Sequence, residues 1–247
     1  MKLIASKITR WTARHTDKAI LPKLEQSIIS FSFDDCPKTA VTNGLPLLEA
    51  EGWRATIYIA LGLCDTTNHL GLHMSEADVI DVHNRNHEIA GHTYSHISAN
   101  AVNHDTFLEN IERNQQKLES LELPRSRHFA YPYGHTTPRL KRELSKRFDT
   151  MRGVLHPSNT KQDASLLRAV RVYSNDSIQL AIDEILKAKV TPKWLHLFTH
   201  DIRENPSEFG CTQDDFEEVV MAVKGSGLPV LTVDEAYRTI MRRGQAL

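Results

Sequence analysis

The segment SIISFSFDDCP, residues 27–37, is the first of several short apolar runs that set the fold class of this chain. Residues 27–33 are rich in Ile and Phe, which predicts a buried β-strand. The run ends in two adjacent carboxylates, Asp34 and Asp35. Like charges this close are unfavourable unless a cation or hydrogen bonds compensate them. The alternative is that one Asp caps a helix near Lys38 while the other faces solvent.

Further short runs of this kind alternate with segments of helical periodicity, which predicts repeated βα units around a parallel sheet. For so many units we expect an α/β fold of the distorted (β/α) barrel type, with about seven βα units in a single domain. The expected strands cover residues 27–33, 54–60, 88–90, 128–131, 150–154, 167–172, 194–199 and 229–232. The expected helices cover residues 38–51, 75–84, 104–121, 137–148, 176–187, 212–224 and 234–242.

The composition is that of a globular chain, with 247 residues, 40% of them hydrophobic and 25% charged. Its 30 basic and 31 acidic residues leave no global positive charge for a nucleic-acid backbone, so we expect no nucleic-acid partner. The chain has no GxGxxG or GxxxxGK[ST] segment. A nucleotide cofactor is therefore not indicated.

Residues 1–26 are expected to form an N-terminal helical extension. Charges interrupt the opening apolar stretch from Lys7 onward, unlike in a signal peptide, and no segment reaches the ~20 apolar residues of a membrane span. The three cysteines are widely spaced and form no CxxC pair, which is typical of free thiols in a reducing compartment. We therefore expect a cytoplasmic protein, with a membrane-peripheral position as the alternative if residues 8–21 form a basic amphipathic helix.

Candidate metal ligands follow a predicted strand in GHTYSH, residues 91–96. A spacing of four places His92 and His96 on one face of a helical turn, where both rings can reach one metal ion. This segment ends a strand, and parallel barrels build their active sites at the carboxyl ends of strands. Two other pairs share the spacing but lack a strand-end carboxylate, and we expect them on solvated surface: His69 with His73, and His83 with His87.

Two later strand ends also carry polar or aromatic side chains. FAYPYG, residues 129–134, is expected to present Tyr131 and Tyr133 near the mouth, where rings stack on sugars, unless they are ordinary core aromatics. In LHLFTHD, residues 195–201, His200 is a candidate general acid, with a capping or surface role as the alternative. His196 in the same strand is expected to be structural.

Taken together and in this order, FSFDDCP, HTYSH, FAYPYG and LFTHD resemble the successive motifs of the polysaccharide deacetylase family, which includes chitin-deacetylase-like and NodB-homology carbohydrate esterases. The resemblance covers roughly residues 27–201 and implies a catalytic domain at 27–247. It implies removal of acetyl groups from an N- or O-acetylated sugar, polysaccharide or lipid-linked glycan. It also implies one divalent metal ion, usually zinc, with cobalt or nickel as alternatives.

The resemblance assigns roles to the polar residues. Asp34 corresponds to the catalytic base and His200 to the acid, and the metal ligands correspond to Asp35, His92 and His96. Three aromatic residues correspond to the substrate and oxyanion region. They are Tyr131, Tyr133 with its backbone N–H on the oxyanion, and Phe198, where many relatives have the leucine that lines the acetyl-methyl pocket.

Three positions depart from the family pattern. Cys36 stands where many relatives have glycine, and its thiol either binds or oxidises beside the metal or is a small buried residue in a turn. Ala130 replaces the arginine that usually braces the catalytic Asp, and Arg152 or Arg168 are candidate substitutes. The acid that orients His200 is also open, and the candidates are Asp176 and Asp201.

Two other functions stay open at this point. One is hydrolysis of another C–N bond, in a cyclic amide or imide, on the same fold. The other is a catalytically silent carbohydrate-binding domain.

Overall fold

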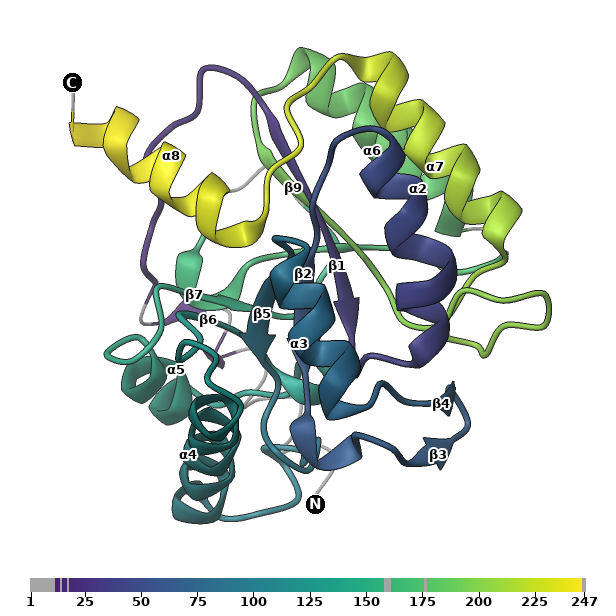
Figure 1. The fold of residues 1–247 in the computed structure, drawn as a ribbon. Coiled ribbons are helices and arrows are strands. Elements are labelled where there is room, and N and C mark those ends of the chain that lie inside the picture. Colours follow the sequence, from purple (N-terminus) through teal and green to yellow (C-terminus); the bar gives the residue numbers. More distant parts are fainter. Residues whose placement is uncertain (1–11, 14, 17, 158–160, 176, 246–247) are drawn as a thin grey trace.

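The computed structural model describes residues 12–13, 15–16, 18–157, 161–175 and 177–245. Its centre is a seven-stranded sheet of order β7-β6-β5-β2-β1-β9-β8 in which every neighbouring pair is parallel. The strands are β1 (Ile28–Asp34), β2 (Thr56–Ile59), β5 (Glu88–Gly91), β6 (His128–Ala130), β7 (Thr150–Arg152), β8 (Val170–Arg171) and β9 (Trp194–Thr199). The sheet curls into a half-barrel with helices outside it, so the predicted (β/α) barrel class is confirmed (Figure 1).

The helices lie where helical periodicity predicts them. They are α2 (Leu45–Ala50), α3 (Glu76–Asn84), α4 (His104–Ser120), α5 (Pro138–Leu144), α6 (Ser177–Val190), α7 (Gln213–Ser226) and α8 (Val233–Gln245). Several begin at side-chain caps, which satisfy amide groups that the first turn leaves unpaired. Ser75 and Thr212 each form a complete capping box, and Asn103 caps α4. No helix among the described residues combines the length and hydropathy of a membrane-spanning segment.

Two predicted elements differ from the structure. Residues 229–232 do not form a strand, because the segment makes only the single bridge between Ile29 and Val230. The helix predicted at 38–51 begins as a π-helical turn at Ala40–Gly44 before it continues as α2. A hairpin that was not predicted joins β3 (Thr67–Asn68) to β4 (Gly71–Leu72).

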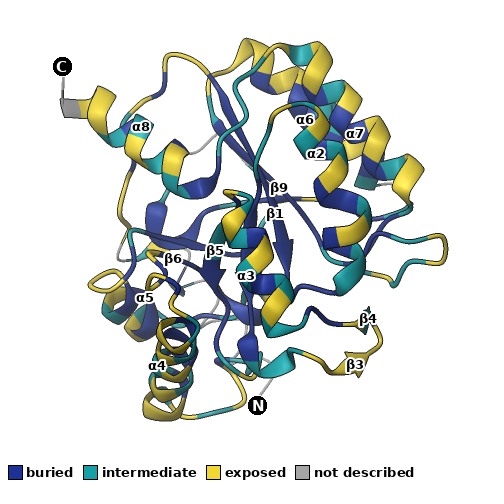
Figure 2. Cartoon of the chain, in the orientation of Figure 1, coloured by how far each residue is buried: buried dark blue, intermediate teal, exposed yellow. Residues whose placement is uncertain are grey.

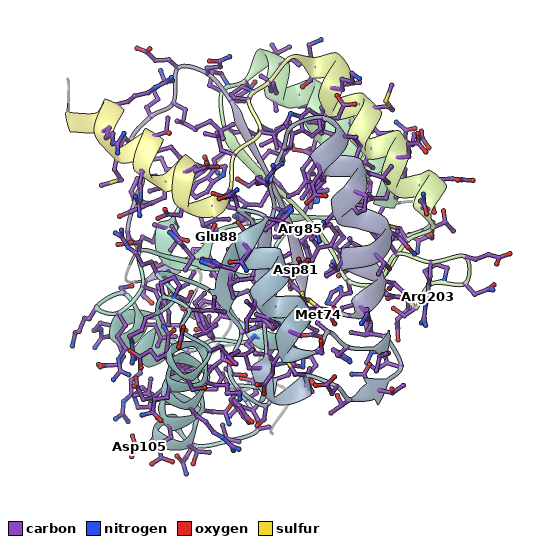
Figure 3. All side chains as sticks on the ribbon, viewed as in Figure 1. Met74, Asp81, Arg85, Glu88, Asp105 and Arg203 are labelled. Atoms are coloured by element: carbon purple, nitrogen blue, oxygen red, sulfur yellow. The ribbon has the colours of Figure 1, made fainter. Side chains whose placement is uncertain are left out.

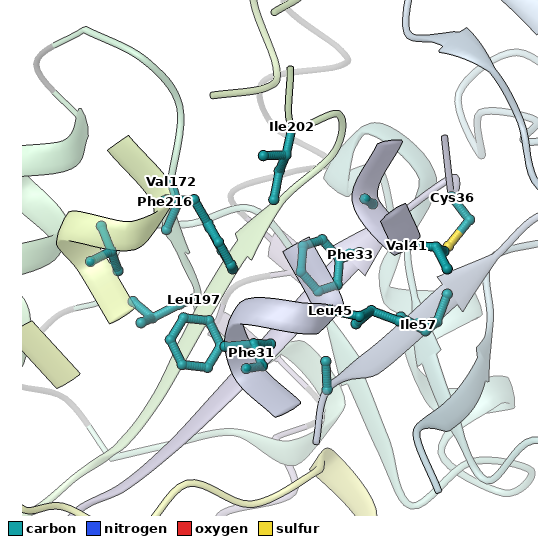
Figure 4. Packing of buried hydrophobic residues seen from close by; sticks show 14 of the residues in the cluster. Phe31, Phe33, Cys36, Val41, Leu45, Ile57, Val172, Leu197, Ile202 and Phe216 are labelled. Carbon is teal, nitrogen blue, oxygen red and sulfur yellow. The ribbon is translucent and has the colours of Figure 1, made fainter. Parts of the chain in front are cut away.

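Strand β1 shows why the sheet has two different faces. Alternate side chains of a strand point to opposite sides, so Ile29, Phe31 and Phe33 share the outer core cluster. Figure 4 shows Phe31 and Phe33 in this cluster beside Leu45 and Phe216. Ile28 packs in a separate cluster on the barrel side, and Asp34 is on this side too because it is an even number of residues away. The central strands of the sheet are largely buried, and the exposed residues of the helices lie on their outer surfaces (Figure 2).

The carboxyl ends of the strands and the loops after them form the functional face. Arg203 (labelled in Figure 3), in the loop after β9, donates to the His69 carbonyl at 3.1 Å and so ties this loop to the β3–β4 hairpin. Five residues after the ends of β1, β5 and β6 have left-handed backbone, which is unusual without glycine. They are Asp35, Cys36, Thr93, His96 and Tyr133.

Candidate metal centre

The carboxyl end of β1 turns sharply through Asp35 and Cys36, whose φ angles are 59° and 70°. The turn separates the two carboxylates, so neither caps the helical turn that follows, which has no side-chain cap. The thiol of Cys36 is fully buried in the outer core, and burial raises its pKa well above the usual value. The Cys36 thiol is also not part of the cluster of possible metal ligands, so of the two interpretations the small buried residue in a turn fits the structure.

His92 and His96 lie in the loop after β5 and not on a helical turn, so the helical geometry predicted from their spacing is wrong. Left-handed residues at Thr93 and His96 turn the loop back on itself. The two rings still come together, with centroids 4.9 Å apart. A tight loop therefore achieves the convergence that the spacing of four suggested.

Asp35, His92 and His96 bring one ligand atom each into a common cluster. Asp35 Oδ1 lies 3.3 Å from His92 Nε2 and 3.1 Å from His96 Nε2. Neither approach has hydrogen-bond geometry, and Oδ1 is buried without a hydrogen-bond partner among the described residues. Ligands at metal distances of 2.0–2.2 Å around a tetrahedral ion are about 3.3 Å apart. These residues therefore fit one small divalent ion.

The protonation states also suit a cation. His92 donates from Nδ1 to the Ala130 carbonyl at 2.8 Å, which leaves its Nε2 atom facing Asp35. Burial lowers the pKa of His96 to about 4, so its ring is neutral at pH 7. Burial would raise the pKa of Asp35, but the rings of His92, His96 and His200 hold it below its usual range. The cluster thus offers one ligand atom from each of two imidazoles and one carboxylate.

The second carboxylate, Asp34, forms a buried ion pair with Arg152 from the end of β7. Both side chains are almost fully inaccessible, and the guanidinium lies 5.0 Å from the Tyr58 ring and 4.6 Å from the Phe198 ring. Of the two candidate cations, Arg152 therefore braces Asp34. Arg168 instead donates to the His156 carbonyl at 2.9 Å.

His200 lies beyond β9, on the same face of the barrel. Its Nδ1 donates to the Phe209 carbonyl at 3.0 Å, so a backbone oxygen sets the orientation of the ring. Asp201 does not orient it, because its carboxylate binds Arg203 at 2.8 Å and Ser207. The other candidate, Asp176, lies outside the described residues.

The three aromatic candidates occupy different places. Tyr131 is fully buried, and its hydroxyl donates to Met151 Sδ at 3.1 Å. It therefore belongs to the core and not to the mouth of the site, because its ring packs against Phe129 in a buried hydrophobic cluster. Tyr133 is 56% exposed and its ring lies 4.5 Å from that of His96. Phe198 is buried between Arg152 and Tyr173.

The other histidines are placed only in part as expected. His69 is exposed, but His73 and His87 are buried, which corrects their assignment to solvated surface. The Nε2 atom of His87 lies 2.9 Å from Glu49, a partner far away in sequence. His196 is fully buried within β9, as expected for a structural residue.

Sequence reasoning missed two neighbours of the site. Phe209 supplies the carbonyl to His200, and no sequence pattern marks a backbone acceptor. Tyr58 is opposite Asp34 in the β1–β2 register, so its side chain shares the interior face. The alternation of side chains along the second strand could have identified Tyr58, if the pairing of the first two strands had been known.

Comparison with known proteins gives many structures with the same fold, including the following three. The Xyl-CE4 domain of a xylanase from the hindgut metagenome of Trinervitermes trinervoides has a TM-score of 0.60 at 18% identity, over 87% of this chain and 91% of that one. The Bc1960 peptidoglycan N-acetylglucosamine deacetylase has 0.62 at 16%, over 89% and 92%. A family 4 acetyl xylan esterase from Clostridium thermocellum has 0.60 at 18%, over 86% and 91%.

Comparison by sequence finds fewer matches than comparison by structure. None of the curated proteins searched matches the chain. The profile described as Polysaccharide deacetylase matches residues 22–149, just over half of the chain and including the turn after β1 and the His92–His96 loop. The chain therefore belongs to the polysaccharide deacetylase family, enzymes that act on acetylated carbohydrate.

Proposed function

We propose that this chain is a metal-dependent hydrolase that removes acetyl groups from an N- or O-acetylated carbohydrate. The observation that carries the proposal is the convergence of Asp35 Oδ1 with two imidazole Nε2 atoms at 3.1 and 3.3 Å, without hydrogen-bond geometry. Asp35, His92 and His96 would hold one divalent ion, zinc by the donor set, with cobalt or nickel as alternatives. We assign the catalytic domain to residues 27–247 and an N-terminal extension to 1–26.

A divalent ion held there supplies Lewis acidity, which activates water and polarises the acetyl carbonyl. The other roles belong to this chain's own residues. Asp34, held in place by its ion pair with Arg152, accepts the proton of the attacking water. The backbone N–H of Tyr133 donates to the developing oxyanion.

His200 acts at the other side of the reaction. Because its Nδ1–H is engaged by the Phe209 carbonyl, Nε2 is the ring nitrogen from which His200 can pass a proton to the substrate. It donates that proton to the leaving amine or alkoxide, whose C–N or C–O bond breaks as acetate forms. Base and acid therefore approach the acetyl group from different strands, β1 and β9.

The side chains that line the site indicate the class of substrate. The exposed ring of Tyr133 beside His96 offers a surface on which a sugar ring can stack. Related folds include an acetyl xylan esterase and a peptidoglycan N-acetylglucosamine deacetylase, whose substrates differ in the acetylated atom. We propose an acetylated sugar, polysaccharide or lipid-linked glycan as the substrate of this chain.

The test is metal content by elemental mass spectrometry, together with acetate release from a panel of N- and O-acetylated sugars before and after chelation. We expect about one metal ion per chain and acetate release that stops with chelator and returns with zinc or cobalt. The exposed His69 provides a matched control, since His69→Ala should keep both metal and activity. Protein that binds no metal and releases no acetate after metal addition would favour one of the two other functions, hydrolysis of a cyclic amide or imide or carbohydrate binding without catalysis.

A further inference from the structure

The barrel interior beneath Asp34 holds polar side chains that are buried without protein partners. They are the Arg152 Nε atom, the Tyr58 hydroxyl and both ring nitrogens of His196. All three residues are fully buried, and none of these four atoms has a partner in hydrogen-bond geometry among the described residues, although the Arg152 guanidinium interacts electrostatically with the Tyr58 hydroxyl. Buried polar atoms of this kind are nearly always bonded to protein or to an ordered water, because an unmet hydrogen bond is costly.

The register of the sheet directs the three side chains into the same interior. Tyr58 is opposite Asp34 on β2, and His196 is opposite Ser30 on β9, an even number of residues from Asp34. The Arg152 guanidinium lies 5.0 Å from the Tyr58 ring while it contacts Asp34. Tyr58 therefore lies beside the cation that braces the proposed base, and His196 faces the same interior, close enough for the charge of Arg152 to help lower its pKa.

The residues next to them in the sheet are small. Ala90 is opposite Tyr58, and Ala130 is opposite Arg152, so each contributes only a methyl group to the interior. The available chemistry also suits water. Burial keeps Tyr58 a neutral hydroxyl by raising its pKa, and burial lowers the pKa of His196 to about 3, so its neutral ring offers one donor and one acceptor.

We propose that ordered water in the barrel interior bonds to the Tyr58 hydroxyl, Arg152 Nε and His196 and thereby fixes Arg152 against Asp34. A buried water has two to four polar partners in such sites, and these three residues provide them. Tyr58 and His196 are then positioning residues, which act on the reaction through Arg152. This inference rests on the proposed role of Asp34 as the base.

The first test is direct and does not depend on activity. A crystal structure of the whole chain at about 1.5 Å resolution should show water within hydrogen-bond distance of the Tyr58 hydroxyl and Arg152 Nε. The absence of density there would overturn the proposal. Because this readout requires no substrate, it stays informative even if the proposed base assignment fails.

The second test uses the sign of a stability change. If the Tyr58 hydroxyl is bonded to water, Tyr58→Phe leaves that water short of a partner, and the thermal midpoint should fall by about 2–4 °C or more. If the hydroxyl is truly unpaired, its removal relieves a desolvation cost and the midpoint should rise, which would overturn the proposal. Tyr237→Phe makes the same change in α8, beside His128 at the other end of the barrel, and should leave turnover unchanged.

The third test separates positioning from stability. Tyr58→Phe should lower kcat about 10-fold with KM and metal content unchanged, because Asp34 loses its fixed partner while the ligands stay in place. A normal kcat would overturn the positioning role. If Asp34→Asn also kept normal kcat, the proposed base would be wrong, whatever the water test shows.

Discussion

Replacing Arg152 by methionine removes the cation that faces Asp34 and keeps a long side chain in its place. The pair is fully buried, with exposed fractions of 0% for Arg152 and 4% for Asp34, so water cannot replace the lost partner. Removing one member of a buried ion pair costs about 3–5 kcal/mol of the free energy of unfolding. For a chain of this size we expect the thermal midpoint to fall by roughly 6–20 °C.

The same change should nearly abolish turnover. Without the guanidinium, the buried carboxylate of Asp34 loses the partner that holds it in place, and the base is no longer positioned to accept a proton. General-base catalysis contributes about 10²- to 10⁴-fold, and most of this factor should be lost from kcat. Metal content should not change, since Arg152 does not contact the ligand atoms of the cluster.

The assays are urea unfolding followed by tryptophan fluorescence, and acetate release at saturating substrate. Arg125→Met is the matched control, because its ion pairs with Glu112 and Glu119 are 41–49% exposed and should each contribute less than about 1 kcal/mol. In the double variant Arg152→Met with Asp34→Asn, no charge stays buried and most of the stability should return. An Arg152→Met protein as stable and as active as the Arg125→Met control would refute this account.

Three further outcomes test other parts of the site. Asp35→Ala should remove metal and activity together, whereas Asp34→Asn should keep the metal and lose about 10²-fold or more in kcat, as measured by elemental analysis and acetate release. Because burial lowers the pKa of His196 to about 3, the unfolded chain binds its proton first as the pH falls below about 6.5. The free energy of unfolding should therefore drop by about 2–3 kcal/mol from this residue between pH 7 and 4.5, and an equally steep slope in His196→Leu would contradict the assignment. Tyr133→Ala should raise KM roughly 2- to 10-fold with little change in metal content, and an unaltered KM would argue against sugar stacking.

Much of the fold could be predicted because it depends on local periodicity. Strand 194–199 is correct to the residue, since an apolar run between turn residues has clear ends. The segment 229–232 is also a short, mainly apolar run, but it makes only one bridge to the sheet. Whether such a run pairs as a full strand depends on tertiary packing, which its own residues do not reveal. The π-helical start of the helix predicted at 38–51 could not be predicted either, because residue propensities do not distinguish a π-helical turn from an α-helical one.

The sequence predicted which residues come together but not the backbone conformation that brings them together. The strand-end rule correctly grouped Asp35 with His92 and His96, although the loop that joins the two histidines is not helical. The partnership of Asp34 with Arg152 spans 118 residues, and only the curl of the sheet brings β7 across to β1. Tyr131 and Tyr133 are alike in sequence, yet one is buried and one exposed because the turn at Pro132 reverses the chain between them.

The left-handed residues in the loops after β1, β5 and β6 have a consequence for how such a chain can evolve. Each non-glycine residue in this conformation costs about 1 kcal/mol or more, and Thr93 is β-branched, for which the conformation is especially rare. Selection for heat tolerance alone would favour glycine or asparagine at these positions. At Asp35 and His96 that exchange would remove a side chain of the cluster. Substitutions that relieve backbone strain at these two positions would therefore stabilise the protein and at the same time abolish the proposed metal site.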